Sequence, residues 1–357
     1  FRDLELYSRI IKNKNIIAVT GTNGKSTTTK LISDILERNC IKNFLGGNIG
    51  IPLINFIKKN NKIKYHVVEL SSFQLESVKS FKPFISILLN ISPDHLDRYK
   101  NYSDYIKQKE KIISLNTNGY NIIFIDNDSN FKIYKKNKKN SIAISSKYLK
   151  KGIYFKGKKI IDNYFDNKKN VNLNHISDSL YGSFNMENIL SAYAVSQILG
   201  LKIHNFLNVI SNFKGLPFRM EKIYEGKKFQ IINNSKATNI NSAINSIFNY
   251  QNINLILGGR AKEKNFTNIL NYKNKINKIY LIGESSDMIF QQLNFKITCE
   301  KFKDIKQAVR KIFHDIKSKK KYQTILFSPA CTSFDQFNNF EKRGKYFNKI
   351  VSSILNE

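Results

Sequence analysis

The stretch that decides the fold is Thr20-Gly21-Thr22-Asn23-Gly24-Lys25-Ser26-Thr27, close to the start of the chain. The apolar run 16–19 before it predicts a buried strand, and the apolar residues after it recur at helical spacing from about Ser26. A glycine loop between a strand and a helix is the setting of a phosphate-binding loop, although Val19 stands where the usual pattern has its first glycine. The stretch therefore predicts a P-loop-type α/β domain.

The residue types in this loop suit an anion. Gly21 and Gly24 allow backbone N–H groups to turn toward a phosphate, and the helix N-terminus adds favourable partial charge. Lys25 can bridge terminal phosphates, and the Ser26 hydroxyl can reach Mg²⁺. An ordinary glycine turn before a capped helix is the alternative, which the strand–loop–helix context disfavours. The predicted phosphate contacts are Gly21, Thr22, Asn23, Gly24, Lys25, Ser26 and Thr27.

The rest of the first half continues the alternation of strand and helix. Buried strands are predicted at 65–70, 85–91 and 122–125, separated by segments of helical length. This alternation indicates a mostly parallel, doubly wound sheet. Residues 146–173 predict short strands and loops, and a helix over 188–199 is expected to stop at Gly200.

A second domain is predicted after Gly215-Leu216-Pro217, which interrupts the pattern. Beyond it, apolar strands at 253–257, 279–282 and 324–327 each run into glycine or polar residues, where open α/β sheets bind ligands. We therefore expect two domains, 1–214 and 215–357, the second a Rossmann-like α/β unit.

Two polar segments that follow predicted strands carry further candidate ligands. Glu69 ends a buried strand, where a carboxylate needs a charge or a metal as partner. Beside a phosphate loop it becomes a candidate Mg²⁺ ligand, and Ser71 could add a second oxygen. In Asn90-Ile91-Ser92-Pro93-Asp94-His95-Leu96-Asp97-Arg98, His95 is flanked by two aspartates, so it is a candidate metal ligand or phosphate contact.

Composition limits the class of protein. The 357 residues are 41% hydrophobic, enough for packed cores, and no apolar run approaches the roughly 20 residues of a membrane span. The net charge of +32 is spread over the chain in Lys- and Asn-rich runs, so no dedicated nucleic-acid surface is expected. The cysteines Cys40, Cys299 and Cys331 fit neither disulfides nor a zinc site, which suits the cytoplasm.

The motifs resemble those of the Mur ligase family, ATP-dependent amide ligases of peptidoglycan synthesis. In the first half the resemblance lies in 21–27, Gly46-Gly47-Asn48-Ile49-Gly50, 69–76 and 92–98. In the second half, Gly215-Leu216-Pro217-Phe218-Arg219-Met220-Glu221, Asn234-Ser235-Lys236-Ala237-Thr238-Asn239, Leu257-Gly258-Gly259 and Ser328-Pro329-Ala330-Cys331-Thr332-Ser333-Phe334-Asp335 resemble the branch that adds D-glutamate. The matching motifs run from about residue 16 to 347.

The resemblance implies a reaction. ATP would phosphorylate the carboxylate of UDP-N-acetylmuramoyl-L-alanine, and the amine of D-glutamate would attack the acyl phosphate. It implies a first Mg²⁺ at Ser26, Glu69 and Ser71, and a second at His95 and a carbamylated Lys109. Read in isolation, Lys109 belongs to a solvated charge run with Lys107 and Lys111, and only the resemblance singles it out. A monomer is expected.

Further roles follow from the same resemblance. Asn48 would lie near the reacting groups. The residues in contact with ATP would be Asn185, Asn188, Arg219 and Lys236. The residues in contact with D-glutamate would be Thr238, Lys262, Ser333 and Phe340. Two positions depart from the family pattern: Phe184 replaces a histidine, and Asn234 replaces an aspartate. The second departure puts nucleotide affinity in doubt.

Family members carry an additional N-terminal domain for the UDP part of the substrate. The resemblance implies that residues 1–14 are the linker from that domain into the first domain of this chain. We expect a fragment of a complete enzyme rather than a truncated gene, because Phe1 is not a normal translation start. Within the ligase class, another Mur ligase or a folylpolyglutamate synthase-like enzyme is the alternative. Outside it, the alternatives are a truncated non-catalytic nucleotide-binding module, a decayed pseudoenzyme and a basic P-loop protein acting on nucleic acid.

Overall fold

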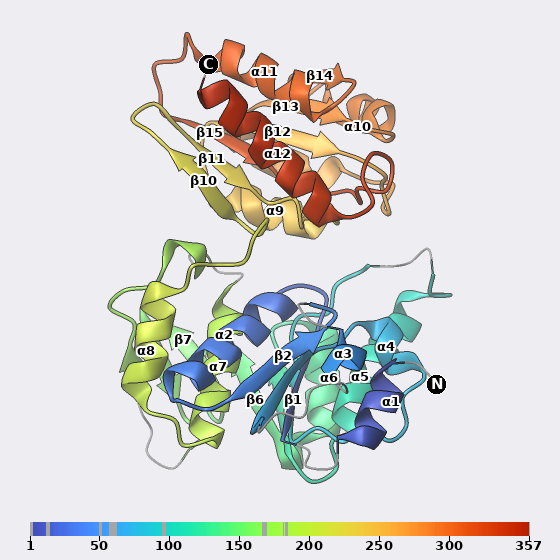
Figure 1. The fold of residues 1–357 in the computed structure, drawn as a ribbon, viewed down its shortest axis with the longest axis vertical. Helices are drawn as coiled ribbons and strands as arrows, with labels where there is room; N and C mark the ends of the chain where they lie inside the picture. Colours follow the sequence, from blue (N-terminus) through green and yellow to red (C-terminus); the bar gives the residue numbers. More distant parts are fainter. Residues whose placement is uncertain are drawn as a thin grey trace. The chain divides into compact units, whose positions relative to one another are not determined.

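A computed structural model describes residues 3–11, 15–49, 52–56, 63–94, 98–165, 170–180, 182 and 185–356. The chain divides into two compact units, Phe1–Lys214 and Gly215–Glu357 (Figure 1). Each unit contains one mostly parallel sheet with helices on both faces, so the predicted α/β class is confirmed. Among the described residues, no helix is long and apolar enough to cross a membrane.

The sheet of the first unit has nine strands in the order β2-β3-β1-β4-β5-β6-β7-β8-β9. Pairing is parallel from β2 to β7 and antiparallel from β7 to β9. The strands are β1 (Ile16–Thr20), β2 (Asn43–Gly47), β3 (Tyr65–Glu69), β4 (Ile85–Leu88), β5 (Tyr120–Phe124), β6 (Ser141–Ser145), β7 (Ile153–Lys156), β8 (Lys159–Asp162) and β9 (Asn170–Asn172). Strand β1 lies between β3 and β4, so the loop that follows it opens at the centre of the parallel part.

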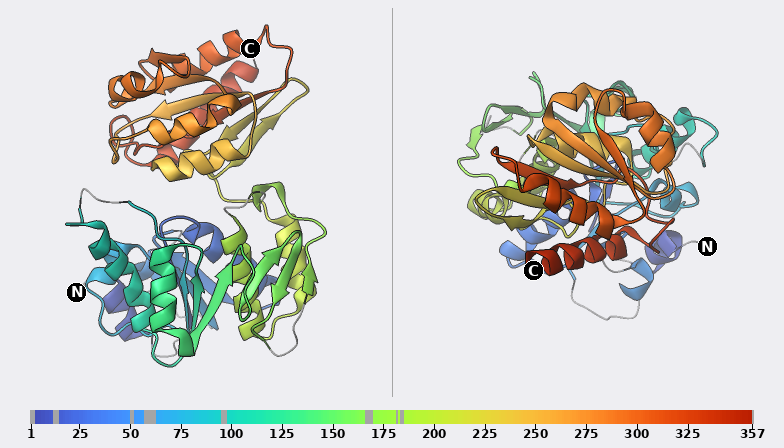
Figure 2. Two further views of the ribbon diagram at one scale, coloured as in Figure 1. Left: turned by 180° about the vertical axis from the view of Figure 1, so that it is seen from behind. Right: turned by 90° about the horizontal axis from the view of Figure 1, so that it is seen from above.

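Helices cover both faces of this sheet (Figure 2). On one face α2 (Lys25–Arg38), α7 (Met186–Ile198) and α8 (Ile203–Asn212) share a core with the strands. The other face is covered by α1 (Asp3–Ile10), α3 (Leu53–Phe56), α4 (Ser72–Glu76), α5 (Tyr102–Ser114) and α6 (Asp128–Lys136). Two short 3-10 helices are η1 (Lys138–Asn140) and η2 (Asp178–Leu180). Leu4 and Tyr7 of α1 are fully buried, so part of the predicted linker packs within the first unit.

The sheet of the second unit has the order β10-β11-β15-β12-β13-β14, with only β10 antiparallel to its neighbour. Its strands are β10 (Glu221–Glu225), β11 (Phe229–Asn233), β12 (Ile253–Gly258), β13 (Ile276–Ile282), β14 (Cys299–Phe302) and β15 (Gln323–Phe327). One face carries α9 (Ile240–Phe248), η4 (Thr267–Lys275) and α10 (Ser286–Leu293), and the other carries α11 (Ile305–Ile316) and α12 (Phe340–Leu355).

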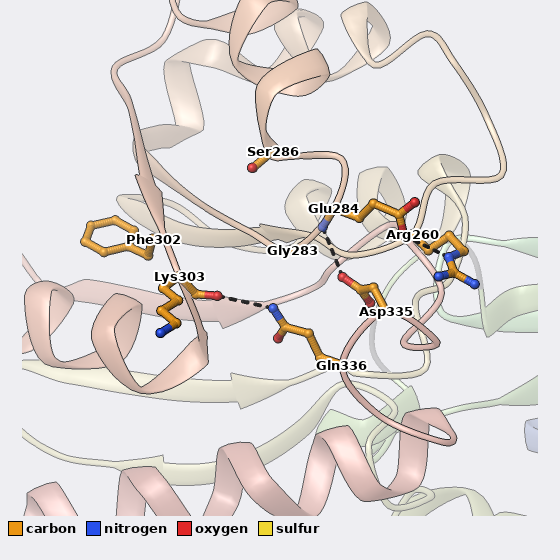
Figure 3. A pocket seen from close by; sticks show the side chains of 8 residues that line it. All are labelled: Arg260, Gly283, Glu284, Ser286, Phe302, Lys303, Asp335 and Gln336. Atoms are coloured by element: carbon orange, nitrogen blue, oxygen red, sulfur yellow. Dashed lines mark hydrogen bonds and ion pairs between the residues drawn. The ribbon is translucent and has the colours of Figure 1, made fainter.

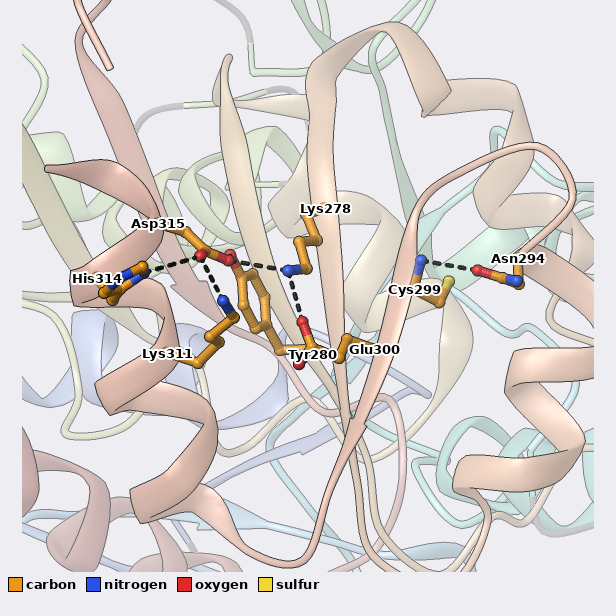
Figure 4. Close-up of polar contacts among 8 residues, drawn as sticks. All are labelled: Lys278, Tyr280, Asn294, Cys299, Glu300, Lys311, His314 and Asp315. Carbon is orange, nitrogen blue, oxygen red and sulfur yellow. Dashed lines mark hydrogen bonds and ion pairs between the residues drawn. The ribbon is translucent and has the colours of Figure 1, made fainter. Parts of the chain in front are cut away.

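A polar network ties α11 to the outer strands of this sheet (Figure 4). The Nζ atom of Lys278 on β13 donates to Glu300 on β14 at 2.6 Å and to Asp315 on α11 at 2.8 Å. The Tyr280 hydroxyl donates to the same Asp315 oxygen at 2.9 Å, and Lys311 pairs with the other oxygen at 3.0 Å. Asp315 is therefore the shared acceptor that joins the helix to the sheet.

The strand predictions differ from the structure at several ends. Strand β4 stops at Leu88, before the predicted end at residue 91, because the backbone follows strand β1 only to its last residue, Thr20, and then bonds to the loop after β1. Leu89 N–H donates to Thr20 O at 2.9 Å, and Thr22 N–H donates to Asn90 O at 2.7 Å. Strand β2 was not predicted, since its sequence Asn43-Phe44-Leu45-Gly46-Gly47 is short and rich in glycine.

Candidate active site

Two lysine amines meet at the loop between β1 and α2. Lys25 Nζ donates to Gly21 O at 2.9 Å and to Thr22 O at 2.7 Å. Lys109 Nζ, from α5, donates to the same Gly21 oxygen at 2.6 Å. Gly24 begins the helix with a φ of 82°. The structure thus gathers two lysine amines and a helix N-terminus at one loop, where the charge of Lys25 and the helix N-terminus favour a bound anion.

Lys109 is buried, in contrast to its neighbours on α5. It is 2% exposed, and its Nζ lies 4.8 Å from the centre of the Tyr105 ring. Burial, and then the charge of Lys25, hold the pKa of Lys109 well below its ordinary value. The Lys107 side chain is 67% exposed, whereas Lys111 donates to Glu76 O at 2.6 Å. The interpretation of these three lysines as one solvated run is therefore wrong for Lys109.

A buried carboxylate lies beside the loop. Glu69 is 1% exposed and accepts from the Ser26 hydroxyl at 2.5 Å and from Asn48 Nδ2 at 2.8 Å. The Asn48 N–H also donates to Glu69 O at 3.0 Å. Parallel pairing places Val19 and Gly47 opposite Glu69, on its two sides. Sheet register thus brings together three predicted site residues that lie far apart in the sequence.

The remaining predicted metal ligands are Ser71 and His95. Ser71 is the N-cap of α4, where its side chain accepts from Gln74 N at 3.3 Å as part of a capping box. His95 and Phe184 lie outside the described residues. Across the described ranges, no cluster of three or more His, Cys, Asp or Glu side chains forms. Mg²⁺ needs no such cluster, because it is commonly bound through one or two carboxylates with waters and substrate phosphates.

Asn188 of α7 lies directly against the loop, and Asn185, the N-cap of that helix, contacts Asn188. Asn188 Oδ1 accepts from the Thr28 hydroxyl at 2.9 Å, and Asn188 Nδ2 donates to Asn185 Oδ1 at 2.8 Å. Both side chains are buried, and a Cβ atom on Gly24 would lie only 2.3 Å from Asn188 Oδ1. These asparagines therefore fix α7 against the phosphate loop and the first turns of α2.

Sequence reasoning missed a second connection between α7 and the loop. Asn90 bonds to both the N–H and the C=O of Asn23, and its own N–H donates to Glu187 at 2.9 Å. Glu187 is 6% exposed, and burial raises its pKa to about 8. The available signals were an asparagine just after a buried strand and an acid beside Asn188, both too common to single out from one sequence.

In the second unit, the predicted D-glutamate residues follow neighbouring strands. Thr238 lies after β11, Lys262 after β12, and Ser333 and Phe340 after β15. The order β11-β15-β12 and the parallel pairing bring these three loops to one edge of the sheet. No hydrogen bond between these four side chains is found among the described residues, so the structure brings their loops together without linking the side chains.

The segments of Arg219 and Lys236 are joined through the backbone. Lys236 N–H donates to Phe218 O at 3.0 Å, and Lys236 Nζ lies 3.8 Å from the centre of the Phe340 ring. Asn234 accepts from Met220 N at 3.3 Å and donates through Nδ2 to Ser328 Oγ at 3.2 Å. Asn234 therefore joins the segment of Arg219 to the loop after β15.

A buried arginine braces these loops. Arg343, on α12, is 2% exposed and donates to Ser235 Oγ at 3.1 Å, Ser235 O at 2.8 Å and Cys331 O at 3.0 Å. Its Nη1 atom is buried with no hydrogen-bond partner among the described residues. Burial lowers its pKa to about 10. Arg343 thus fastens the loop after β11 to the loop after β15.

A pocket of about 410 Å³ lies at the same edge of the second sheet, beyond β13 and β14 (Figure 3). Its lining residues are Arg260, Gly283, Glu284, Ser286, Phe302, Lys303, Asp335 and Gln336. Within it, Arg260 pairs with Glu284 at 2.8 Å, and Asp335 accepts from the backbone N–H of Glu284 at 3.1 Å. None of the four predicted D-glutamate residues lines this pocket.

Comparison with known proteins places the chain in a class and then in a branch of it. Residues 19–196 match the Mur ligase middle domain. The chain is 41% identical to the UDP-N-acetylmuramoylalanine–D-glutamate ligase of Rickettsia bellii, over 99% of this chain and 79% of that protein. The ligase of the same name from Rickettsia prowazekii is 40% identical, over 98% and 78%. The chain therefore belongs to the Mur ligase family.

A solved structure has the same fold. The MurF ligase of Thermotoga maritima, in complex with ADP, superposes with a TM-score of 0.73 at 19% identity, covering 98% of this chain and 84% of that one. This likeness shows the fold of both units. The branch within the family rests on the sequence relatives, which are D-glutamate ligases.

Proposed function

We propose that this chain forms the amide bond between the carboxyl group of UDP-N-acetylmuramoyl-L-alanine and the amine of D-glutamate, at the expense of ATP. The observation that carries the proposal is the convergence of Lys25 and Lys109 on Gly21 O, with the Ser26–Glu69 pair at the same loop. The names of the sequence relatives supply the substrates, and the ADP complex of the MurF ligase supports a nucleotide.

The phosphate loop is proposed to hold the triphosphate of ATP. The ammonium group of Lys25 and the N-terminus of α2 both favour a bound anion at this loop. Phosphate oxygens can replace the Gly21 and Thr22 carbonyls as acceptors for Lys25. Arg219 and Lys236 of the second unit are proposed as further phosphate contacts, and Asn185 and Asn188 support the loop from α7.

The donor set at the loop suits Mg²⁺, which prefers oxygen ligands. Glu69 and Ser26 would hold a first ion with Ser71 nearby, and His95 and Lys109 would hold a second. The ions would offset the charge of the triphosphate and of the substrate carboxylate. To bind a metal ion, Lys109 must become a carbamate. Its neutral amine attacks the carbon of CO₂, forms an N–C bond and loses a proton. Its burial favours that neutral amine.

The second unit is proposed to bind D-glutamate at Thr238, Lys262, Ser333 and Phe340. A lysine and two hydroxyls are suitable partners for its carboxylates. A carboxylate oxygen of the first substrate attacks the γ-phosphorus of ATP, and ADP leaves. The D-glutamate nitrogen then attacks the acyl carbon, and inorganic phosphate leaves with loss of a proton from the nitrogen. Asn48 would lie near these reacting groups. Residues 1–214 would be the central ATP-binding domain and 215–357 the C-terminal domain.

The test is phosphate release that depends on both substrates, with the product identified by mass spectrometry. Lys25→Ala, Glu69→Ala and His95→Ala are each expected to abolish it. Lys109→Ala is expected to do the same, whereas Lys107→Ala, on an exposed position of the same helix, should retain wild-type turnover. Turnover with meso-diaminopimelate or L-lysine in place of D-glutamate, or full activity of Lys25→Ala, would overturn the proposal.

A further inference from the structure

We propose that Glu187 is a positioning residue for the phosphate loop and acts on it through the side chain of Asn90. This inference rests on the proposed function, because it concerns the loop assigned to the nucleotide phosphates. Glu187 lies in the first turn of α7, far from the loop in sequence, and touches it only through Asn90 among the hydrogen bonds of the described residues.

Asn90 holds the loop at three points. Its Oδ1 accepts from Asn23 N at 3.2 Å, its Nδ2 donates to Asn23 O at 3.2 Å, and its backbone O accepts from Thr22 N at 2.7 Å. Asn23 lies between the two glycines of the loop, where backbone direction decides which N–H groups face an anion. The side-chain amide of Asn90 therefore fixes the peptide groups on both sides of Asn23.

Glu187 and Asn23 together fix the sense of that amide. Glu187 accepts from the Asn90 N–H at 2.9 Å and, with its other oxygen, from Asn90 Nδ2. If the amide turned over, Oδ1 would face both Glu187 and Asn23 O, and Nδ2 would face the Asn23 N–H. Every side-chain contact would then pair two acceptors or two donors. With Glu187 in place, only the observed orientation satisfies the loop.

A carboxyl group is needed for this task. Both oxygens of Glu187 can accept a hydrogen bond, whether or not the group carries a proton, whereas a glutamine offers one acceptor and one NH₂. In Glu187→Gln, the NH₂ must therefore meet one of the two Asn90 donors. Because the site is 6% exposed, water cannot relieve the mismatch cheaply. Asn90 then loses a partner on the side away from the loop, and its hold on the backbone around Asn23 is weakened.

A matched control, at the end of strand β8, contacts the same helix. Asp162 is 1% exposed and accepts from the hydroxyl of Tyr193, on α7, at 3.0 Å. It also accepts from two backbone N–H groups, and none of its hydrogen bonds reaches the phosphate loop. Asp162→Asn therefore makes the same buried carboxyl-to-amide change against α7, but without a path to Asn23.

The experiment is calorimetric titration of the full chain with ADP and Mg²⁺. Glu187→Gln is expected to weaken ADP binding about tenfold, the equivalent of one ordinary hydrogen bond, while Asp162→Asn binds like the wild type. Where turnover is measured, KM for ATP should rise and KM for D-glutamate should stay unchanged. Equal losses in the two variants, or wild-type binding by Glu187→Gln, would overturn the inference.

Two further variants keep the outcome clear. Asn90→Ala is expected to weaken ADP binding at least as much, and the double variant with Glu187→Gln should be no weaker than Asn90→Ala alone. Additive losses would overturn the route through Asn90. If Glu187→Gln does not fold, ADP binding by Asn90→Ala tests the route to the loop. Asn90 is only half-buried, so its replacement is expected to leave the protein folded. Lys25→Ala separates the two proposals: if it binds ADP normally, the phosphate-loop assignment itself fails.

Discussion

Alanine at Gly24 tests how tightly the phosphate loop is packed against α7. Gly24 has a φ of 82°, where an L-residue pays ~1–2 kcal/mol. The new Cβ would lie 2.3 Å from Asn188 Oδ1, far inside contact distance. Asn188 must move, and its hydrogen bonds to Thr28 and Asn185 are then broken at a cost of ~1 kcal/mol each.

These terms add to a loss of ~3–4 kcal/mol in the free energy of unfolding of the first unit. For a unit of 214 residues, that corresponds to a fall of ~6–16 °C in Tm. The control is Gly200→Ala, just after the end of α7. Gly200 also has a positive φ, 62°, but a Cβ there would meet no atom within 4 Å. Gly200→Ala is therefore expected to lower the free energy of unfolding only by the backbone strain, ~1–2 kcal/mol.

Differential scanning calorimetry of both variants measures the difference, which isolates the contact with Asn188. ADP titration should also show lost binding in Gly24→Ala and unchanged binding in Gly200→Ala. If the two variants lower Tm equally, Asn188 does not buttress the loop as the structure indicates, and the reasoning from the Cβ position is refuted.

Three further predictions concern other parts of the chain. Burial lowers the pKa of His66 to about 4, and its Nδ1 pairs with the Tyr7 hydroxyl at 2.5 Å, so the neutral ring belongs to the fold. The contribution of His66 to the free energy of unfolding is complete above pH 6.5 and is lost as pH falls toward 4. Urea unfolding between these pH values should show the loss, and His66→Gln should make the unfolding free energy depend less on pH. Arg343→Met should lower the unfolding free energy of the second unit by ~2–4 kcal/mol, because the Ser235 and Cys331 carbonyls lose their donors, whereas the exposed Arg310→Met should change it by less than ~0.5 kcal/mol. Asp315→Asn should cost ~1–2 kcal/mol by urea unfolding, and a cost that does not shrink at high salt would contradict the ionic account of the network in Figure 4.

The sequence alone determined the features that depend on neighbouring residues. The strand–loop–helix setting of 20–27 was predicted because glycines, a lysine and a hydroxyl stand between an apolar run and a helical pattern, all within one short stretch. The alternation of strands and helices gave the α/β class for the same reason. The central strands β1, β3, β12 and β15 were predicted within one or two residues at each end, because buried parallel strands are short apolar runs.

Tertiary structure decided which distant residues meet. Strand order and register place Glu69 beside Ser26, and packing of α5 buries Lys109 while Lys107 stays in water. Neither outcome can be read from spacing, since Lys107 and Lys109 differ only in which face of the helix meets the sheet. The path from Glu187 through Asn90 to Asn23 depends on three separate elements converging. Local preferences fix the elements, but only the packed core fixes their neighbours.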